Sequence, residues 1–384
     1  MNLFKNESII HENQSYLRNI INIKYGLKNI IHKGIEFNYK EPLCGSDEVV
    51  NVKIVKLFIT AVAQLNDNHI LIVSNENIGQ IYLINEEYFS LIKEIKLSSI
   101  FFLPLKKPNY LFSSEGNNKH EDWLSSLKNE KSSFILRYND SFSFSNMQKI
   151  DIPSDFAVES NDGRIFTSKK FRKNIQVLKL NSKNKYEKIF TISSKEDVYG
   201  KPFVYKDKYL IYQTEHELIV NDLNEDKIIK SFKIENSFGN GEMRAVKENI
   251  LVVVIYRGFS LYDMEKLEFI KYITPGYDNI LSQNLCVLNN GILLVGFSDS
   301  FIGVYDINDD FKEIELWHYI CEYEADFILY FQKEGYIAVG SSDNSKERNE
   351  CIYIHSVKRL LKREKQNFWN LSYPDNNINI VKAK

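Results

Sequence analysis

Val304-Tyr-Asp-Ile-Asn308 is one copy of a short segment that recurs along most of the chain. In most copies, two apolar positions separated by two variable residues are followed by a polar turn. The other copies are Ile81-Tyr-Leu-Ile-Asn85, Leu136-Arg-Tyr-Asn-Asp140, Val177-Leu-Lys-Leu-Asn181, Val220-Asn-Asp-Leu-Asn224, Leu261-Tyr-Asp-Met-Glu265 and Ile352-Tyr-Ile-His-Ser356. Successive copies begin 55, 41, 43, 41, 43 and 48 residues apart. A step of about 40–45 residues is typical of the four-stranded blades of a propeller.

The recurrence predicts an all-β fold, a seven-bladed β-propeller of four-stranded antiparallel blades over residues 52–364. Each blade buries both faces of its sheet against its neighbours, so only a closed ring leaves no blade face exposed. Short apolar runs between clusters of Asn, Asp, Gly, Ser and Lys indicate the strands. A two-sheet sandwich predicts no such step and is not favoured.

The composition is that of a globular protein with a large core. The chain has 384 residues, 43% of them hydrophobic and 13% aromatic, and a net charge of −2. Aromatic side chains favour strands because they pack well on a pleated surface. A protein that binds nucleic acid mainly through phosphate contacts usually carries a basic excess. Nucleic acid is therefore not the favoured partner, although a local basic patch is compatible with a net charge of −2.

Cysteine spacing and the apolar runs predict the compartment. Cys44, Cys286, Cys321 and Cys351 stand apart with no C-x-x-C pair, which is typical of buried thiols in a reducing compartment. The N-terminus lacks an apolar run followed by a cleavage site. The longest apolar runs are too short to cross a membrane. We therefore expect a cytoplasmic or nuclear protein without a transmembrane segment.

Residues Leu293–Ile307 resemble the second and third strands of a WD40 repeat. Gly296, Ser298 and Asp299 are similar to that family's turn, and Tyr305-Asp306 stands where Trp-Asp is usual. Related residues in neighbouring repeats are Asn221-Asp222, Tyr262-Asp263 and Gly340-Ser-Ser-Asp343. The sequence departs from the family in having no Gly-His pair near the start of a repeat and no Trp-Asp pair. The resemblance implies a non-catalytic platform within a larger assembly.

The two ends of the chain do not fit the repeat. Residues 1–50 form a predicted N-terminal extension with a possible helix over 14–31 and a strand over 35–39. That strand could close the ring as the outer strand of the last blade. Lys358–Lys365 is interpreted as the last strand of the seventh blade followed by a solvated tail, 365–384. The alternative for Lys358–Lys365 is a basic helix that binds a partner or a membrane surface.

Three unusual turns, each between the second and third strands of a blade, are the candidate binding region. They are Ser114–Ser132, Lys169–Lys173 and Ser341–Glu350. Equivalent turns open on the same face of a propeller, and binding residues tend to lie on loops held by a rigid scaffold. The candidate partner-binding residues are Lys169, Lys170, Phe171, Arg172, Lys173, Trp123, Leu124, Leu127, Asp343 and Arg348.

Each of these features has a structural alternative. The basic turn Lys169–Lys173 could bind an anion, or it could be a solvated hairpin tip in a lysine-rich protein. Residues Glu121–Lys128 could form one or two helical turns with Trp123, Leu124 and Leu127 on one side. That apolar side could dock in a partner's groove or fold back onto its own blade.

The sequence contains no catalytic pattern. The seven histidines are scattered without metal-ligand spacing, and Gly296-Phe-Ser298 lacks the second glycine of a nucleophile elbow. We predict no catalytic, cofactor-binding or metal-binding residues and no enzyme. The favoured function is a protein-interaction scaffold or adaptor subunit of an intracellular complex. The alternatives are an anion-recognising module that binds RNA or phospholipid headgroups through Lys169–Lys173, and a channel-centred enzyme or metabolite binder.

Overall fold

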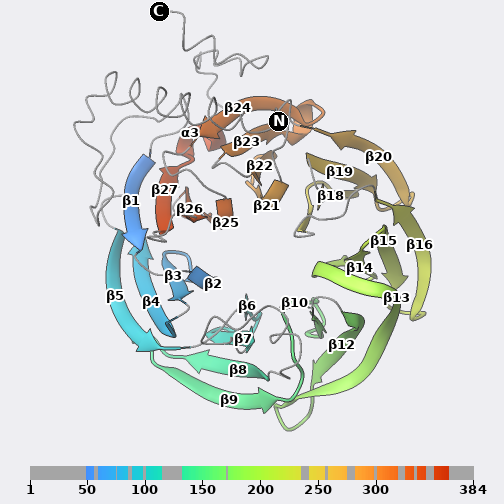
Figure 1. Ribbon diagram of the computed structural model, residues 1–384, viewed down its shortest axis with the longest axis horizontal. Helices are drawn as coiled ribbons and strands as arrows, with labels where there is room; N and C mark the ends of the chain where they lie inside the picture. The colour runs from blue at the N-terminus through green and yellow to red at the C-terminus, as the bar shows by residue number, and fades with distance from the viewer. Residues whose placement is uncertain are drawn as a thin grey trace, which may run out of the picture.

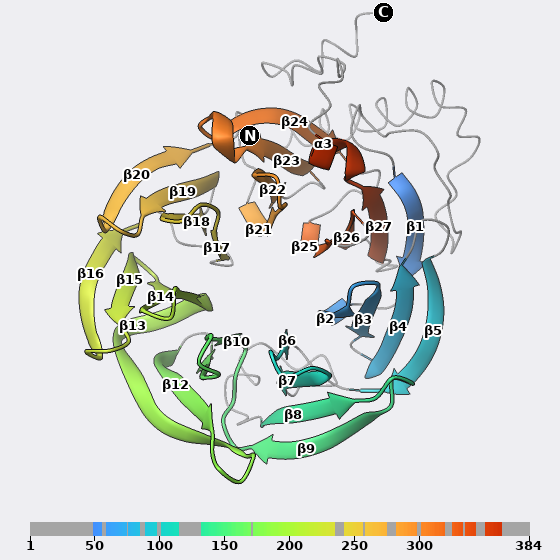
Figure 2. The same ribbon diagram turned by 180° about the vertical axis from the view of Figure 1, so that it is seen from behind.

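The computed structural model is an all-β propeller, a ring of antiparallel sheets around a common axis (Figures 1 and 2). The structure describes residues 49–362 except 56–58, 75, 85–88, 98–100, 115–131, 170–171, 235–241, 256–257, 275–281, 298–300, 319–324, 333–334 and 343–349. The extension 1–48, including the predicted helix 14–31 and strand 35–39, and the tail beyond 362 lie outside this part. No helix in the described part is long and apolar enough to cross a membrane.

Five of the six sheets have four strands. The first two are β2 (Ile59–Asn66), β3 (His69–Ser74), β4 (Ile78–Ile84) and β5 (Phe89–Lys96), then β6 (Phe101–Pro104), β7 (Tyr110–Ser114), β8 (Ser133–Tyr138) and β9 (Phe144–Ile150). Later come β17 (Met243–Ala245), β18 (Ile250–Ile255), β19 (Gly258–Asp263) and β20 (Glu268–Ile273), and β21 (Ser282–Val287), β22 (Ile292–Phe297), β23 (Phe301–Asp306) and β24 (Lys312–His318). The last is β25 (Ala325–Phe331), β26 (Tyr336–Ser342) and β27 (Glu350–Ser356), with β1 (Val49–Val55). The apolar runs of the first repeat predict strands over 56–63, 69–74, 79–84 and 91–96, and β2–β5 agree with these ranges to within three residues.

The sixth sheet has seven strands, which corrects the expectation of separate four-stranded blades throughout. It contains β10 (Phe156–Glu159), β11 (Ile165–Ser168), β12 (Arg172–Leu180), β13 (Tyr186–Tyr205), β14 (Tyr209–Thr214), β15 (Glu217–Asp222) and β16 (Lys227–Lys233). The 20-residue strand β13 pairs first with β12 and then, from Val198 onward, with β14. Because its backbone stays extended from the rim to the centre of the ring, two four-stranded units share one strand.

The ring is closed by β1, which pairs antiparallel with β27 and forms the outer edge of that sheet. Val49 lies opposite His355 and Val55 opposite Glu350. In Figure 1 the blue strand β1 lies beside the red strand β27, so the two ends of the described chain meet in one sheet. The strand in this position is Val49–Val55, whereas the sequence suggested 35–39 for it.

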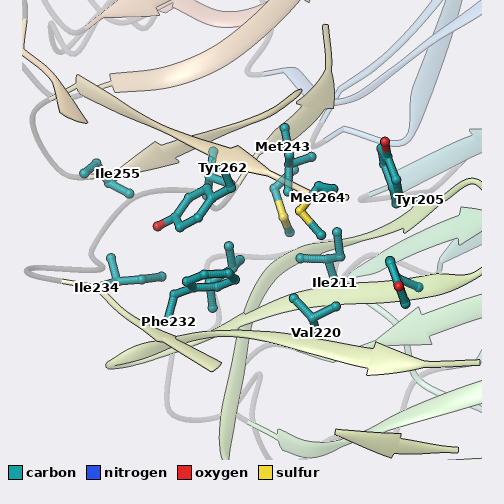
Figure 3. Packing of buried hydrophobic residues seen from close by; sticks show 13 residues of the cluster. Tyr205, Ile211, Val220, Phe232, Ile234, Met243, Ile255, Tyr262 and Met264 are labelled. Carbon is teal, nitrogen blue, oxygen red and sulfur yellow. The ribbon is translucent and has the colours of Figure 1, made fainter. Parts of the chain in front are cut away.

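The core lies between neighbouring sheets, as the continuous apolar runs of the central strands require. Every residue of β14 and β22 is buried, because both faces of these strands pack against other sheets. Figure 3 shows the interface between β14–β16 and β17–β19. There the rings of Phe232 and Tyr262 lie 4.9 Å apart between centroids, with Met243 and Met264 beside them.

Three copies of the recurrent segment have an aspartate at their third position, and this aspartate has a defined structural role. Asp222, Asp263 and Asp306 each end a third strand, and one carboxylate oxygen accepts N–H groups of the following turn. Asp263 Oδ1 accepts from Glu265 N at 2.9 Å and Lys266 N at 3.0 Å. These bonds satisfy turn donors that the sheet ladder leaves unpaired.

The segment after β27 differs from its prediction. Lys358–Lys362 forms a short helix, α3, and the position of the last strand belongs to β1. Leu360 of α3 is buried, and its carbonyl accepts a hydrogen bond from Asn290 Nδ2 at 2.6 Å. The segment is helical because these contacts dock it against the neighbouring sheet.

Candidate functional site

The three predicted binding turns all connect second and third strands: β7–β8, β11–β12 and β26–β27. Since successive strands are antiparallel, these connections open on one face of the ring, which we call the candidate face. Within the predicted set, the structure describes Lys169, Arg172 and Lys173. Lys170, Phe171, Trp123, Leu124, Leu127, Asp343 and Arg348 lie outside the described residues.

The β11–β12 turn is compact and presents cations to solvent. Arg172 N donates to the Lys169 carbonyl at 3.2 Å, while the side chains of Arg172 and Lys173 are exposed and Lys169 is half-buried. Below the turn, Ser168 is buried and its hydroxyl donates to the Gly200 carbonyl at 3.5 Å. The cations therefore stand on a strand end whose backbone is anchored to β13.

Carboxylates lie near Tyr199, which follows the residue opposite Arg172. Arg172 is opposite Val198 in the sheet register, next to Tyr199. Burial raises the pKa of Tyr199, and Glu215, Asp197 and Glu196 raise it further through their negative charge. The region around the turn thus carries both signs of charge, a feature that the basic run Lys169–Lys173 alone did not reveal.

A second group of ionisable residues lies on the inner strands, where the sequence had indicated no site. Glu242, just before β17, holds Arg244 through Oε1, 2.5 Å from Arg244 Nη2. Its other oxygen, Oε2, accepts the Leu285 N–H of β21 at 2.8 Å. Arg244 also donates from Nη1 to the Met243 carbonyl at 3.1 Å. Glu242 therefore links Arg244 to the neighbouring sheet.

Lys201 of β13 belongs to the same group. Its side chain keeps part of its surface exposed, yet protein atoms crowd it, and this burial lowers the pKa of Lys201 to about 8. The positive charge of Arg244 lowers this pKa further, whereas Glu242 opposes the shift. The Lys201 ammonium lies 6.0 Å from the ring centroid of Phe101 on β6, two inner strands away around the ring.

Cys286 and Tyr330 complete the group. Burial raises the pKa of Cys286 to about 12, with a smaller opposing effect from Arg244. Burial also raises the pKa of Tyr330, as does the neighbouring Cys286. A thiol with so high a pKa stays protonated at neutral pH and is a poor nucleophile. The arrangement therefore suits charge recognition rather than covalent chemistry, and the described residues contain no metal-binding group.

No linear motif could have revealed the inner-strand group. Lys201, Glu242 and Cys286 are each about one repeat apart, so they converge only when the ring closes. Cationic, acidic and thiol side chains at equivalent places in successive repeats would have been the available signal.

Comparisons with known proteins place the fold. No family model matches the chain, and no curated protein matches its sequence. Among solved structures, the crystal structure of the WD40 β-propeller domain of Doa1 is similar, with a TM-score of 0.57 and 12% sequence identity. The similarity covers 78% of this chain and 93% of that domain. The ring of antiparallel sheets and this similarity together show that the chain has the fold of a WD40 β-propeller.

Proposed function

We propose that this protein is a non-catalytic interaction scaffold, an adaptor subunit of an intracellular complex that binds its partner on the candidate face. We count the ring as seven four-stranded units, with β13 serving as the outer strand of one unit and the inner strand of the next. On a ring of this kind, turns of unusual length and charge can vary while the sheets beneath them stay rigid.

The single observation that carries the proposal is the connectivity of the three turns. β7–β8, β11–β12 and β26–β27 are equivalent connections, and their sheets are separated around the ring only by the sheet β2–β5 and the joint at β1. The proposed surface is therefore one arc of one face. WD40 propellers usually bind other proteins, and the fold supports this class of partner.

Charge favours a protein over RNA or a phospholipid surface as the partner. Arg172 and Lys173 are exposed, but Glu196, Asp197 and Glu215 lie close to Tyr199 beside them. A polyanion would be repelled by these carboxylates, whereas a protein surface can present both signs of charge in complementary positions.

The test compares two charge reversals in one sheet. Arg172→Glu with Lys173→Glu alters the candidate face, and Lys183→Glu with Lys185→Glu alters exposed lysines of the β12–β13 turn on the opposite face. Tagged full-length proteins are purified from source cells, and co-purifying proteins are quantified by mass spectrometry. We expect a stoichiometric protein partner that the first variant loses and the second retains.

Two results would contradict the proposal. One is the absence of any stoichiometric protein partner of the wild type, and the other is equal retention by both variants. Loss of salt-sensitive RNA or vesicle binding in the first variant alone would favour an anion-recognising module instead.

A further inference from the structure

The inner-strand group holds more positive charge than its own residues neutralise. Lys201 and Arg244 are cations, and Glu242 is the carboxylate that acts on both. That carboxylate is already engaged, by Arg244 at 2.5 Å and by the Leu285 N–H at 2.8 Å. One positive charge therefore remains without a matching anion.

The unmatched charge is at Lys201. Among the residues that the structure describes, its ammonium makes no hydrogen bond and no ion pair, and its described contact is the ring of Phe101 at 6.0 Å. The Phe101 ring in turn packs edge-to-face on Phe156 of β10, with centroids 6.3 Å apart. A crowded ammonium beside aromatic rings has lost part of its hydration, and this costs free energy unless an anion compensates.

Arg244 is oriented as a binding group would be. Glu242 fixes Nη2 and the Met243 carbonyl fixes Nη1, so the guanidinium is held in place. A guanidinium has five N–H donors, and the described bonds leave several of them available. Its side chain keeps 36% of its surface exposed, which leaves it accessible from outside.

We propose that Lys201 and Arg244 form a binding site for a small oxyanion, a phosphate or carboxylate group, at the inner strands of the ring. Glu242 acts as a positioning residue that aims the guanidinium. Bound there, the oxyanion supplies the negative charge that Lys201 lacks and joins the units containing β13 and β17. This site is separate from the candidate face and does not depend on the scaffold function.

The test uses inorganic phosphate and acetate, which represent the two sources of an oxyanion. Thermal unfolding of the full chain is followed while each anion replaces chloride at constant ionic strength, in the wild type, Lys201→Met and Lys195→Met. Lys195 is an exposed lysine on the same strand and serves as the matched control. We expect a saturable rise in melting temperature in the wild type and Lys195→Met, and none in Lys201→Met. The anion whose stabilising effect saturates at the lower concentration shows whether the site prefers a phosphate or a carboxylate group.

A second variant and a second measurement cover a failure of Lys201→Met to fold. Arg244→Gln should weaken binding of the preferred anion by roughly tenfold, since a charge-assisted hydrogen bond is lost. NMR titration of ¹³C-methylated lysines should show the Lys201 pKa rising when that anion binds. The proposal is overturned if neither anion stabilises the wild type, or if all variants respond equally.

Discussion

The third residue of the recurrent segment is an aspartate in three copies, Asp222, Asp263 and Asp306, and each accepts an N–H group of the turn that follows it. The sequence resemblance placed these aspartates in the position of the WD40 Asp, and the structure assigns them a local role. In Asp263 one oxygen accepts two backbone N–H groups, while Oδ2 accepts Asn249 Nδ2 at 3.0 Å. The backbone bonds from Lys266 and Glu265 outweigh burial and hold the pKa of Asp263 below its usual range.

Replacing Asp263 should destabilise the fold measurably. Asp263→Ala leaves three donors without their acceptor, so we expect the free energy of unfolding to fall by about 1–3 kcal/mol. Asp263→Asn keeps one oxygen and should cost less. Urea denaturation measures the stability of both variants. Asp309→Ala is the control because Asp309 is exposed and its ion pair with Lys312 is long, at 3.9 Å. Equal losses for Asp263→Ala and Asp309→Ala would refute this role.

Lys201 makes a second prediction at the residue scale, in the absence of added oxyanion. Its pKa is about 8 in the folded chain and 10.5 when unperturbed. Between these values the unfolded chain binds more protons, so stability rises with pH through this window. Below pH 8 the charged side chain costs on the order of 3 kcal/mol. Lys201→Met should therefore be more stable than the wild type at pH 7, and the gap should close toward pH 10.5.

Urea unfolding of both proteins at several pH values measures this gap. The pKa values of Cys286 and Tyr186 are raised to about 12 and lower stability as pH rises from about 9 or 10, respectively. Both proteins retain these groups, so their effect cancels in the difference. A gap that stays constant with pH would show that the Lys201 charge carries no folding cost.

At the scale of the elements, most strands could be predicted because burial on both faces leaves an apolar run in the sequence. β14, β18 and β22 are examples, and polar turns mark their ends. The shared strand β13 could not be predicted in the same way. Its middle residues, Ser193–Asp197, are polar because the chain there passes from one four-stranded unit to the next within the same sheet. Polar runs of this kind are usually loops. Only the pairing of its two ends with β12 and β14 makes this segment a strand.

The strand β1 offers a prediction about ring closure. A chain that begins at residue 49 keeps β1, whereas a chain that begins at residue 56 removes the outer strand paired with β27. The second truncation should have a lower melting temperature and a less cooperative transition than the first, because it leaves the β27 edge unpaired. Calorimetry of the two truncated proteins measures the difference, and identical curves would show that β1 does not support the ring.

At the scale of the whole molecule, the ring was predictable and the inner-strand group was not. The repeat length determines the ring, since each copy is visible as a local pattern. The inner-strand group depends on contacts between successive units. No member of the group, which comprises Lys201, Arg244, Glu242 and Cys286, belongs to a recognisable motif in its own repeat. The candidate face was predictable in part. Its turns could be recognised from their length and charge, whereas the acidic residues near Tyr199 could not be assigned to it from the sequence.

The pairing of Val49 with His355 has a consequence for synthesis. On the ribosome β1 is made before the other described strands, whereas β27, its partner in the described part, is made after all of them. Until then β1 has an open edge, and the sheet it completes does not exist. Contacts between residues so distant in sequence form slowly. An unpaired strand exposes backbone N–H and C=O groups that can pair with strands of other chains. The nascent protein should therefore depend on protection of β1 until β27 has emerged.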